Sequence, residues 1–461
     1  MSLRVTIDDI ALFERPMAFR LPFRFGAVTV TEAPQAFVRV RLSSGDGSSA
    51  VGVAAEMMMP KWFDKDPAKT PADTIADLRL SLTTAAGLYR RAANTPESAF
   101  GHHARVYQQQ IRATGELGLP SLAGAYGPAL IDKAIVDGVL KLGGLDLATG
   151  LRTNAIGLDS RLTNDVAQED IDTFLQGITP QPRVSLRHTI GFVDAPDALA
   201  DELGDARPRY FKIKLSGDVA ADCARLRALA PVLEALVPDF LASLDANEQY
   251  DRSRLAELTT ALRKEPFLSR LKSRLLYIEQ PLDRAATFLT PIEDAGDIPF
   301  IIDEADGGYD AFPKAAALGY RGVSSKTCKG LYKSLINAAR AAAWNRRDGA
   351  AGHWFVSGED LTCQAGLGVQ QDTALVACLG ISHVERNGHH YVRGFGTAPT
   401  AEAARFAAAM PGLYERQGDA FVLAVGAGEL PTAPLFTPGF ASGATPDWAS
   451  LTQVEGHTNV A

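Results

Sequence analysis

The sequence predicts an α/β protein whose larger part is a (β/α) barrel, and three observations support this fold class. From Gly127 onward, short apolar strands alternate with helical segments at a regular spacing. Several of these strands end in a charged residue, as expected where strand ends surround one opening. The first 125 residues follow a different pattern, in which strands come first and helices follow. Periodicity alone leaves an open doubly wound sheet as the alternative to the barrel.

The composition indicates a globular protein with two domains. A chain of 461 residues exceeds one ordinary domain, and its 46% hydrophobic residues suffice for a sizeable core. The net charge of -8 argues against a nucleic-acid or anionic-membrane partner. No signal peptide or membrane-spanning apolar run is evident, so we expect a soluble cytoplasmic protein. Four scattered cysteines without a C-x-x-C pair predict neither a disulfide scaffold nor a structural zinc site.

The N-terminal region is expected to be an α+β domain over residues 1–125. RVTIDDIALFE and AFVRVRLSS alternate between apolar and polar residues, and the turn SSGDGSS leads into AVGVAAE. Helical periodicity follows from about Ala72 to Arg91 and from Glu97 to Thr114. The barrel is then expected over residues 126–396. The tail, residues 397–461, is rich in Pro, Gly and Ala and is expected to pack back on the first domain.

Eight strand–helix units are expected in the barrel. The helix PALIDKAIVDGVLKL and the strand RVSLRHTIGFV form the first unit, and ISHVER is the last strand. A helix through Phe288 and Ile292 is expected after LLYIEQ, and Asn387-Gly388 suggests a hairpin turn after ISHVER. The strands between the first and the last are FKIKL, FLASLDA, LLYIEQ, PFIIDEA, GVSSK and WFVSGED.

One predicted strand, FKIKL, carries two lysines. Lys212 and Lys214 are two residues apart, so both side chains point to the same side of the sheet. Two neighbouring ammonium groups repel, and each is expected to lower the pKa of the other toward the range of a base. The alternative is an edge strand with two solvated lysines, which the flanking apolar residues disfavour.

The next three strands end in carboxylates. Asp245, Glu279 and Asp303 follow apolar strands and would converge into an oxygen-rich site suited to Mg²⁺. Each alone could cap the following helix, but three in succession favour a metal site. Glu304 is a rival third ligand, and alternation allows only one of Asp303 and Glu304 to face inward.

A further lysine follows the next strand. Lys326, within VSSKTCKG, would lie across the barrel mouth from Lys214, with the carboxylates between them. Lys329 falls in the turn, and we expect it to be solvated.

These motifs resemble the enolase superfamily, in its mandelate racemase/muconate-lactonizing-enzyme subgroup. KIK, DAN, IEQP, DEA and SKTCKG occur in the family's order, ALIDKAIVD is similar to the helix that begins its barrel, and FRLPFRFG looks like part of its capping domain. The resemblance covers nearly the whole chain. It implies a modified TIM barrel with an α+β capping domain.

The resemblance also implies roles for the charged residues. Lys214 and Lys326 would be acid/base groups on opposite faces of a small carboxylate substrate, and Lys212 would tune Lys214 and help neutralise the substrate. Asp245, Glu279 and Asp303 would bind Mg²⁺. The implied chemistry is removal of the proton next to the carboxylate, through an enediolate. Relatives with this architecture commonly form homo-oligomers.

Three functions remain open. The first is a racemase, epimerase or cycloisomerase; the second is a lyase, either a dehydratase or an enzyme similar to o-succinylbenzoate synthase. The third is a barrel that binds a carboxylate without reaction. Departures from the family pattern leave the substrate open: Gln364 stands where a glutamate is expected, SKTCKG has one glycine where relatives often have two, and residues 62–70 suggest an insertion.

Weaker signals have two interpretations each. The Met57–Met59 segment, with Trp62 and Phe63, could line the substrate pocket or form an apolar contact between domains. Glu359 and Asp360 could touch substrate, although capping the next helix is the preferred interpretation. The histidine pairs His389-His390, on a hairpin, and His102-His103, on a surface helix, could bind a metal, although solvated side chains are the preferred interpretation. We expect Cys328 and Cys363, near the barrel mouth, to be free thiols.

Overall fold

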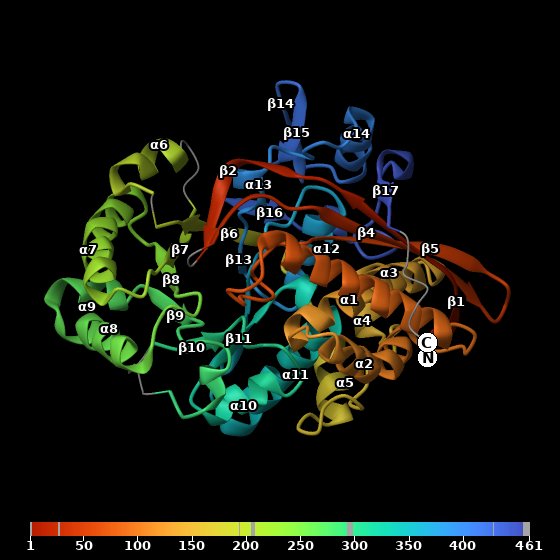
Figure 1. The fold of residues 1–461 in the computed structure, drawn as a ribbon, viewed down its shortest axis with the longest axis horizontal. Coiled ribbons are helices and arrows are strands. Elements are labelled where there is room, and N and C mark those ends of the chain that lie inside the picture. Colours follow the sequence, from red (N-terminus) through yellow and green to blue (C-terminus); the bar gives the residue numbers. More distant parts are fainter. Residues whose placement is uncertain are drawn as a thin grey trace.

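Eight parallel strands form a closed barrel in the computed structural model, which describes residues 2–25, 28–192, 194–203, 208–292, 298–426 and 428–454 (Figure 1). The last strand pairs with the first, with Val384 opposite Leu186, so the barrel is confirmed and the open sheet is excluded. The barrel strands are β6 (Arg183–Ile190), β7 (Tyr210–Lys214), β8 (Leu241–Asp245), β9 (Leu275–Glu279), β10 (Phe300–Ile302), β11 (Gly322–Ser325), β12 (Phe355–Gly358) and β13 (His383–Glu385).

Helices follow most barrel strands and cover the outside of the barrel (Figure 1). They are α6 (Leu199–Leu203), α7 (Val219–Leu236), α8 (Arg252–Lys264), α9 (Pro266–Lys272), α10 (Ala311–Ala317), α11 (Leu331–Asp348), α12 (Leu367–Cys378) and α13 (Gly388–Tyr391), with short 3₁₀ turns η1 (Pro196–Ala198), η2 (Ala286–Phe288) and η3 (Thr327–Lys329).

Two local predictions in the barrel are wrong. Within the described residues between β9 and β10, only η2 forms in place of the predicted helix. Pro291 lies in this segment, and a proline removes a backbone donor that a continuing helix needs. The Asn387-Gly388 pair does not make a hairpin, because Gly388 begins α13.

The N-terminal part consists of an antiparallel sheet covered by helices, as expected for an α+β capping domain (Figure 1). The sheet contains β1 (Val5–Arg15), β4 (Gln35–Ser44) and β5 (Ser49–Met57), and β2 (Ala18–Phe25) pairs with β3 (Val28–Glu32) beside it. The helices are α1 (Pro71–Ala92), α2 (Ala99–Glu116), α3 (Ser121–Leu142), α4 (Leu147–Arg152) and α5 (Gln168–Gln176).

Local sequence explains where the first helices begin. Thr70 caps α1 by accepting from the backbone N–H of Asp73, and the Asp73 side chain accepts from the Thr70 backbone in return. Pro71 occupies the first helical position, where its missing N–H costs nothing. Ser98 caps α2 through one bond, in which its side chain accepts from the backbone N–H of Gly101. Both helices therefore start within a few residues of the predicted positions.

The C-terminal segment contacts the capping sheet and the barrel. It contains α14 (Thr400–Ala409), β14 (Tyr414–Gln417), β15 (Ala420–Leu423), β16 (Glu429–Pro431), η4 (Ala433–Leu435), η5 (Trp448–Ser450) and β17 (Thr452–Gln453). β17 pairs with β1, and β16 pairs with barrel strand β6. Glu402 on α14 forms a buried bidentate ion pair with Arg15 on β1, at 2.8 and 2.7 Å. The domain boundaries at residues 125 and 396 stay predictions.

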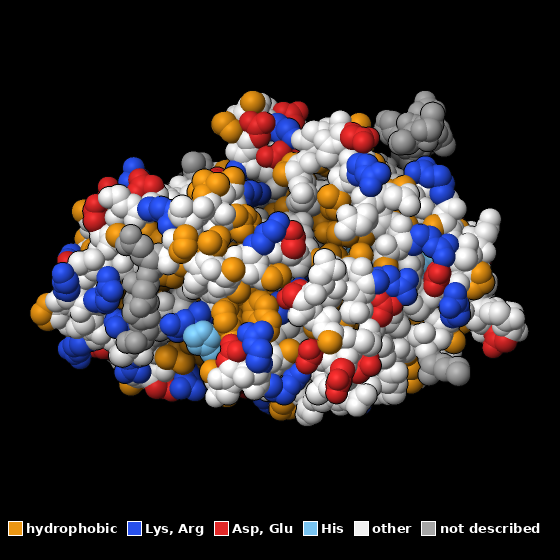
Figure 2. Space-filling view, turned by 90° about the horizontal axis from the view of Figure 1, so that it is seen from below, with side chains coloured by type: hydrophobic (Ala, Val, Ile, Leu, Met, Phe, Trp, Pro, Cys, Tyr) orange, Lys and Arg blue, Asp and Glu red, His pale blue; other side chains and the backbone are white. Residues whose placement is uncertain are grey.

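The described part of the chain contains no helix that is both long and apolar enough to cross a membrane. On the face that Figure 2 shows, acidic and basic side chains are interspersed, and hydrophobic side chains gather near the middle.

Candidate active site

The six predicted site residues come together at the carboxyl ends of neighbouring barrel strands. The register places Lys214 beside Asp245 and Asp245 beside Glu279. All six residues are at most 4% exposed, so the charged groups are enclosed in the barrel mouth. They are Lys212 and Lys214 on β7, Asp245 on β8, Glu279 on β9, Asp303 after β10, and Lys326 after β11.

Two lysines flank the row of carboxylates. Lys214 Nζ donates to Asp245 Oδ2 at 2.6 Å and to Asn247 Oδ1 at 2.9 Å. Lys326 Nζ donates to Asp303 Oδ2 at 2.6 Å. Burial lowers the pKa of Lys326, but the adjacent Asp303 carboxylate outweighs burial, and the net pKa is raised. In strand order Glu279 therefore lies between two lysine–aspartate pairs.

Lys212 lies at the centre of the buried charges. Its Nζ is 2.9 Å from Asp245 Oδ2, 2.8 Å from Glu279 Oε2, 2.9 Å from Glu359 Oε2 and 2.8 Å from Glu385 Oε2. Burial lowers the pKa of Lys212, but these carboxylates together raise it well above its ordinary value. The prediction that the lysine pair lowers the pKa of this group is wrong, because the carboxylates outweigh the repulsion between the ammonium groups.

The buried charges around Lys212 include two residues that the sequence analysis missed, Glu385 and Arg187. The sequence analysis named Glu359 but did not predict its contact with Lys212. Glu385 ends β13 and reaches Lys212, and Arg187 on β6 pairs with Glu359 inside the barrel. Tyr277 Oη also donates to Glu359 Oε1, at 2.7 Å. Burial raises the pKa of Glu359, but the charges of Arg187 and Lys212 lower it to about 2. The rule that charged residues at strand ends face the barrel mouth, applied to β12 and β13, would have found both glutamates.

Asp360, next to Glu359, has a structural role. Its carboxylate accepts from the backbone N–H groups of Cys363 at 2.9 Å and Asn387 at 2.8 Å, and it forms an ion pair with Arg386. It therefore joins the loop after β12 to the loop after β13. It does not cap α12, which begins at Leu367.

Asp303 and Glu304 point to different partners. Asp303 receives the Lys326 hydrogen bond, whereas Glu304 Oε1 accepts from Asn247 Nδ2 at 3.1 Å and from Lys65 Nζ at 3.2 Å. Asp303 is therefore the carboxylate that lies in the row with Asp245 and Glu279.

Lys329 is buried, so the prediction of a solvated turn lysine is wrong. Its Nζ donates to Ser324 Oγ at 2.7 Å and lies 3.1 Å from Asp306 Oδ2. Lys329 is the last residue of the 3₁₀ turn η3, and its side chain reaches Asp306 in the loop that follows β10.

A segment of the capping domain closes the barrel mouth. Lys326 Nζ lies 4.4 Å from the centre of the Trp62 ring. Arg284, in the loop after β9, donates to the carbonyl oxygens of Phe63 at 2.9 Å and Trp62 at 3.2 Å. Lys65 Nζ forms an ion pair with Glu248 Oε2 at 2.6 Å. These bonds hold the segment that follows β5 against the barrel.

The Met57–Met59 segment is fully buried beneath this contact. Thr362 Oγ1 of the barrel lies 4.0 Å from Met59 Sδ. Gln364 is also buried, and its amide donates to the Thr362 carbonyl at 3.2 Å. The Met57–Met59 segment therefore makes an apolar contact between the capping domain and the barrel, which is one of the two interpretations given for it from the sequence.

The first histidine pair is buried, in contrast to the prediction. His102 Nε2 lies 2.8 Å from the Val5 carbonyl, and His103 Nδ1 lies 2.6 Å from Asp132 Oδ2. Helix α2 packs against α1 and α3, and its polar composition concealed this burial.

The second histidine pair is half-buried and lies on α13 instead of a hairpin. Arg20 Nε donates to the His390 carbonyl at 2.7 Å.

Burial raises the pKa of the Cys328 and Cys363 thiols well above the ordinary value, so these free cysteines are poor nucleophiles.

The donor set of Asp245, Glu279 and Asp303 fits a hard divalent cation such as Mg²⁺, because it offers carboxylate oxygens. Burial, together with the neighbouring Asp245 and Glu359 carboxylates, raises the pKa of Glu279 well above its ordinary value. Glu279 Oε2 also lacks a hydrogen bond of good geometry, although Lys212 Nζ lies 2.8 Å away. The neighbouring carboxylates thus place a negative potential on Glu279, which a bound cation would offset.

The side chains, however, are not arranged as a finished metal site. Among the described residues, no three acidic, histidine or cysteine side chains converge as metal ligands. Lysine ammonium groups contact the same oxygens that a cation would take, since Lys214 holds Asp245 and Lys326 holds Asp303. A bound cation would take the place of these contacts.

The described residues form a (β/α) barrel with an α+β cap, and the barrel mouth encloses a row of charged side chains. The chain matches no protein-family profile, and no curated protein matches its sequence. Solved structures with the same fold cover almost the whole chain at low sequence identity, so the likeness that the motifs indicated is confirmed for the fold.

Three of these structures show the range of activities. A dipeptide epimerase from Cytophaga hutchinsonii, complexed with Mg and a dipeptide, has a TM-score of 0.60 and 16% identity, and the match covers 97% of this chain and 99% of that one. A dipeptide epimerase from Enterococcus faecalis, also complexed with Mg and a dipeptide, has a TM-score of 0.58, 15% identity and coverages of 95% and 99%. The 2-chloromuconate cycloisomerase from Rhodococcus opacus has a TM-score of 0.58, 16% identity and coverages of 96% and 97%.

Proposed function

We propose that this chain is an Mg²⁺-dependent enzyme that removes the proton next to a substrate carboxylate and returns a proton from the opposite side. The observation that carries this proposal is the placement of two buried lysines, Lys214 and Lys326, at the two ends of the row of carboxylates. A racemase or epimerase needs such an acid/base group on each face of the substrate, whereas a cycloisomerase needs only one of the two. The epimerases and the cycloisomerase of the same fold support this reaction type.

Each residue has a task in this reaction. Asp245, Glu279 and Asp303 would hold Mg²⁺, which supplies positive charge to the substrate carboxylate as negative charge develops there. Lys214 would take the proton on one face. Lys326, whose raised pKa keeps it protonated, is in the form that donates a proton on the other face. Lys212 stays charged and would compensate the carboxylates that surround it.

The enclosed position of the lysines supports the same proposal. Trp62 covers Lys326, and Arg284 holds the Trp62 carbonyl, so water is kept from the proton-transfer groups. In a dry site the fixed charges act on the substrate more strongly than they would in water.

One observation favours a lyase as the second candidate. Lys326 is held by both Asp303 and the Trp62 ring. An ammonium group fixed in this way could stabilise charge without moving a proton. In that case Lys214 would be the only base, as in a dehydratase or an enzyme similar to o-succinylbenzoate synthase.

Proton exchange in D₂O distinguishes these functions. Proton NMR would follow the α-proton of each enantiomer in a panel of carboxylates with Mg²⁺ present. Dipeptides would be tested first, because the two dipeptide epimerases of this fold hold them. If two bases act, Lys214→Ala and Lys326→Ala should each abolish exchange from a different enantiomer.

The other outcomes are equally specific. Loss of exchange in Lys214→Ala alone would support the one-base lyase. Lys314→Ala, which removes an exposed lysine paired with Asp310, is the control and should leave exchange unchanged. A wild-type protein that binds a carboxylate with Mg²⁺ but exchanges no proton would overturn the enzyme proposal in favour of a binding barrel.

A further inference from the structure

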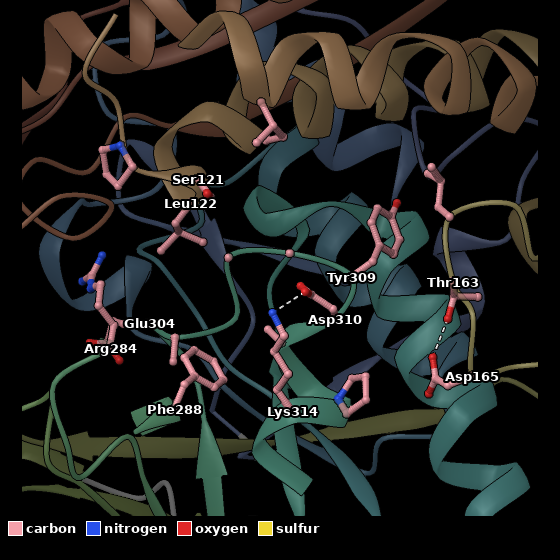
Figure 3. A pocket seen from close by; sticks show the side chains of 18 of the residues that line it. Ser121, Leu122, Thr163, Asp165, Arg284, Phe288, Glu304, Tyr309, Asp310 and Lys314 are labelled. Atoms are coloured by element: carbon pink, nitrogen blue, oxygen red, sulfur yellow. Dashed lines mark hydrogen bonds and ion pairs between the residues drawn. The ribbon is translucent and has the colours of Figure 1, made fainter. Parts of the chain in front are cut away.

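The loop that follows β10 gives two successive carboxylates different surroundings. Lys326 Nζ donates to Asp303 in the barrel mouth, at 2.6 Å. The Glu304 side chain is fully enclosed and accepts from Asn247 and Lys65. Figure 3 shows Glu304 at one end of an open cavity of about 1280 Å³, and the described residues that line this cavity include none of the three proposed Mg²⁺ ligands. A constraint on this loop must therefore decide which carboxylate joins the row.

Gln280, which follows Glu279 at the end of β9, holds this loop from the neighbouring strand. Its Oε1 accepts from the backbone N–H of Asp303 at 2.8 Å and from that of Ala305 at 3.0 Å. These two N–H groups flank Glu304 in the chain. One side-chain oxygen therefore fixes the backbone on both sides of Glu304, and this leaves Asp303 as the carboxylate in the barrel mouth.

The carboxamide of Gln280 is held in one orientation. Its Nε2 donates to the Leu282 carbonyl at 2.8 Å and to Thr287 Oγ1 at 3.0 Å, so both donors and the acceptor oxygen are in use. A flipped amide would turn its NH₂ group toward two backbone N–H donors and its oxygen toward a carbonyl. Gln280 is 0% exposed, and unpaired polar groups are costly in such a place.

The main chain of Gln280 also links the loops after β8 and β10. Its N–H donates to the Ile301 carbonyl at 2.9 Å, and its carbonyl accepts from the Glu248 N–H at 2.9 Å. Its φ of +37° lies in the left-handed region, which non-glycine residues seldom adopt and which persists where surrounding bonds enforce it. Asp245 and Asp303 lie within three residues of these contacts. Gln280 is therefore bonded to both segments that carry the other two proposed ligands.

We propose that Gln280 is a positioning residue, which makes Asp303 instead of Glu304 the third carboxylate available to Mg²⁺. It acts through the backbone N–H groups of Asp303 and Ala305 and is assigned no contact with the ion or the substrate. This inference rests on the Mg²⁺ site of the proposed function and adds the residue that selects one of its ligands.

Isothermal titration calorimetry of the full chain with Mg²⁺, in the absence of substrate, tests this role. Gln280→Met removes the acceptor at a similar side-chain length and should weaken Mg²⁺ binding by about ten- to a hundredfold, as loss of an outer-shell partner does. Thr287→Val is the matched control, because Thr287 is also 0% exposed and its loss removes a bond from the other end of the same carboxamide. It should bind Mg²⁺ as the wild type does, since Leu282 still orients the amide.

Two further variants separate positioning from stability. Gln280→Glu keeps an acceptor for the two N–H groups and loses the donors, so it should recover Mg²⁺ binding. In the Gln280→Met background, Asp303→Asn should weaken Mg²⁺ binding by a smaller factor than in the wild type, because Asp303 is already displaced. A glutamine with only a structural role would lower the melting temperature of Gln280→Met and leave its Kd for Mg²⁺ unchanged.

Several results would overturn this inference. They are an unchanged Kd in Gln280→Met, an equal loss of affinity in Thr287→Val, and full additivity of Gln280→Met with Asp303→Asn. If Gln280→Met does not fold, Mg²⁺ binding that is about tenfold weaker in Gln280→Glu than in Thr287→Val would overturn it instead. A wild type that binds no Mg²⁺ would overturn the proposed function and this inference with it, so the two failures are distinguishable.

Discussion

The ammonium group of Lys326 lies 4.4 Å from the centre of the Trp62 indole ring. Trp62 belongs to the segment that follows β5 in the capping domain, and Lys326 follows barrel strand β11. A cation over an aromatic face is attracted by the ring quadrupole, and more strongly when both groups are shielded from water. The contact therefore joins the capping domain to one of the two proposed acid/base groups.

A double-mutant cycle should measure this contact. Unfolding in urea of Trp62→Leu, Lys326→Met and the double variant should give a coupling free energy of about 0.5–2 kcal/mol. The cycle cancels the separate cost of leaving Asp303 without its lysine. Trp62→Phe keeps an aromatic face, so its coupling to Lys326→Met should lie below that measured with Trp62→Leu. Equal coupling for Leu and Phe would show that the ring face contributes nothing.

The position of the charged residues could be predicted from sequence because it depends on strand geometry alone. Side chains alternate along a strand, and the carboxyl ends of parallel strands meet at one opening. Asp245, Glu279, Asp303 and Lys326 therefore lie together, as their places at strand ends indicated. The depth of Lys212 in the barrel could not be predicted, because its partners Glu359 and Glu385 belong to strands far along the chain.

Long-range partners explain the remaining errors. Lys329 is buried because Asp306 lies beside it, and His103 is buried because Asp132 of α3 faces it. Such pairs cannot be read from local periodicity. Barrel closure also depends on a long-range pairing, because β13 pairs with β6 across about 200 residues of chain. Strand–helix alternation allows this pairing but does not require it.

Mg²⁺ should stabilise the native protein through the three strand-end carboxylates. A ligand that binds only the folded state adds about 2.7 kcal/mol to the free energy of unfolding when its concentration is about a hundredfold above Kd. Differential scanning calorimetry with and without Mg²⁺ should therefore show a raised Tm for the wild type. Asp245→Asn, Glu279→Gln and Asp303→Asn should each lose most of that increase, whereas Asp310→Asn, at an exposed carboxylate, should keep it. An equal rise in all four variants would locate the ion elsewhere.

Glycine at position 52 is required by the close packing of α3 on β5. A Cβ at Gly52 would lie 1.8 Å from the Ala134 carbonyl oxygen and 2.6 Å from the Gly138 nitrogen, both backbone atoms that cannot move aside. Gly52→Ala should therefore lower the free energy of unfolding by about 1–3 kcal/mol or more. Gly45→Ala is the control, because nothing lies within 4 Å of its added Cβ, and it should change stability by less than about 0.5 kcal/mol. Urea unfolding of both variants would show whether the two differ.

His383 should make the protein less stable in acid. It begins β13, stacks on Tyr210 with ring centres 4.2 Å apart, and its Nδ1 lies 3.3 Å from Arg187 Nη1. Burial, and then the Arg187 charge, lowers the pKa of His383 from 6.5 to about 3. Between these values the unfolded chain binds a proton that the native protein does not. The stability contribution is therefore complete above about pH 6.5 and is lost as the pH falls toward 3.

His383→Gln removes the titrating group and keeps an acceptor for Arg187. Between about pH 7 and about pH 4, the free energy of unfolding of the wild type should fall by about 1–3 kcal/mol more than that of this variant. Urea unfolding across this range would measure the difference. His353→Gln, at an exposed histidine, should follow the wild type. If His383→Gln loses stability in acid as steeply as the wild type does, the proton is taken up by another buried group.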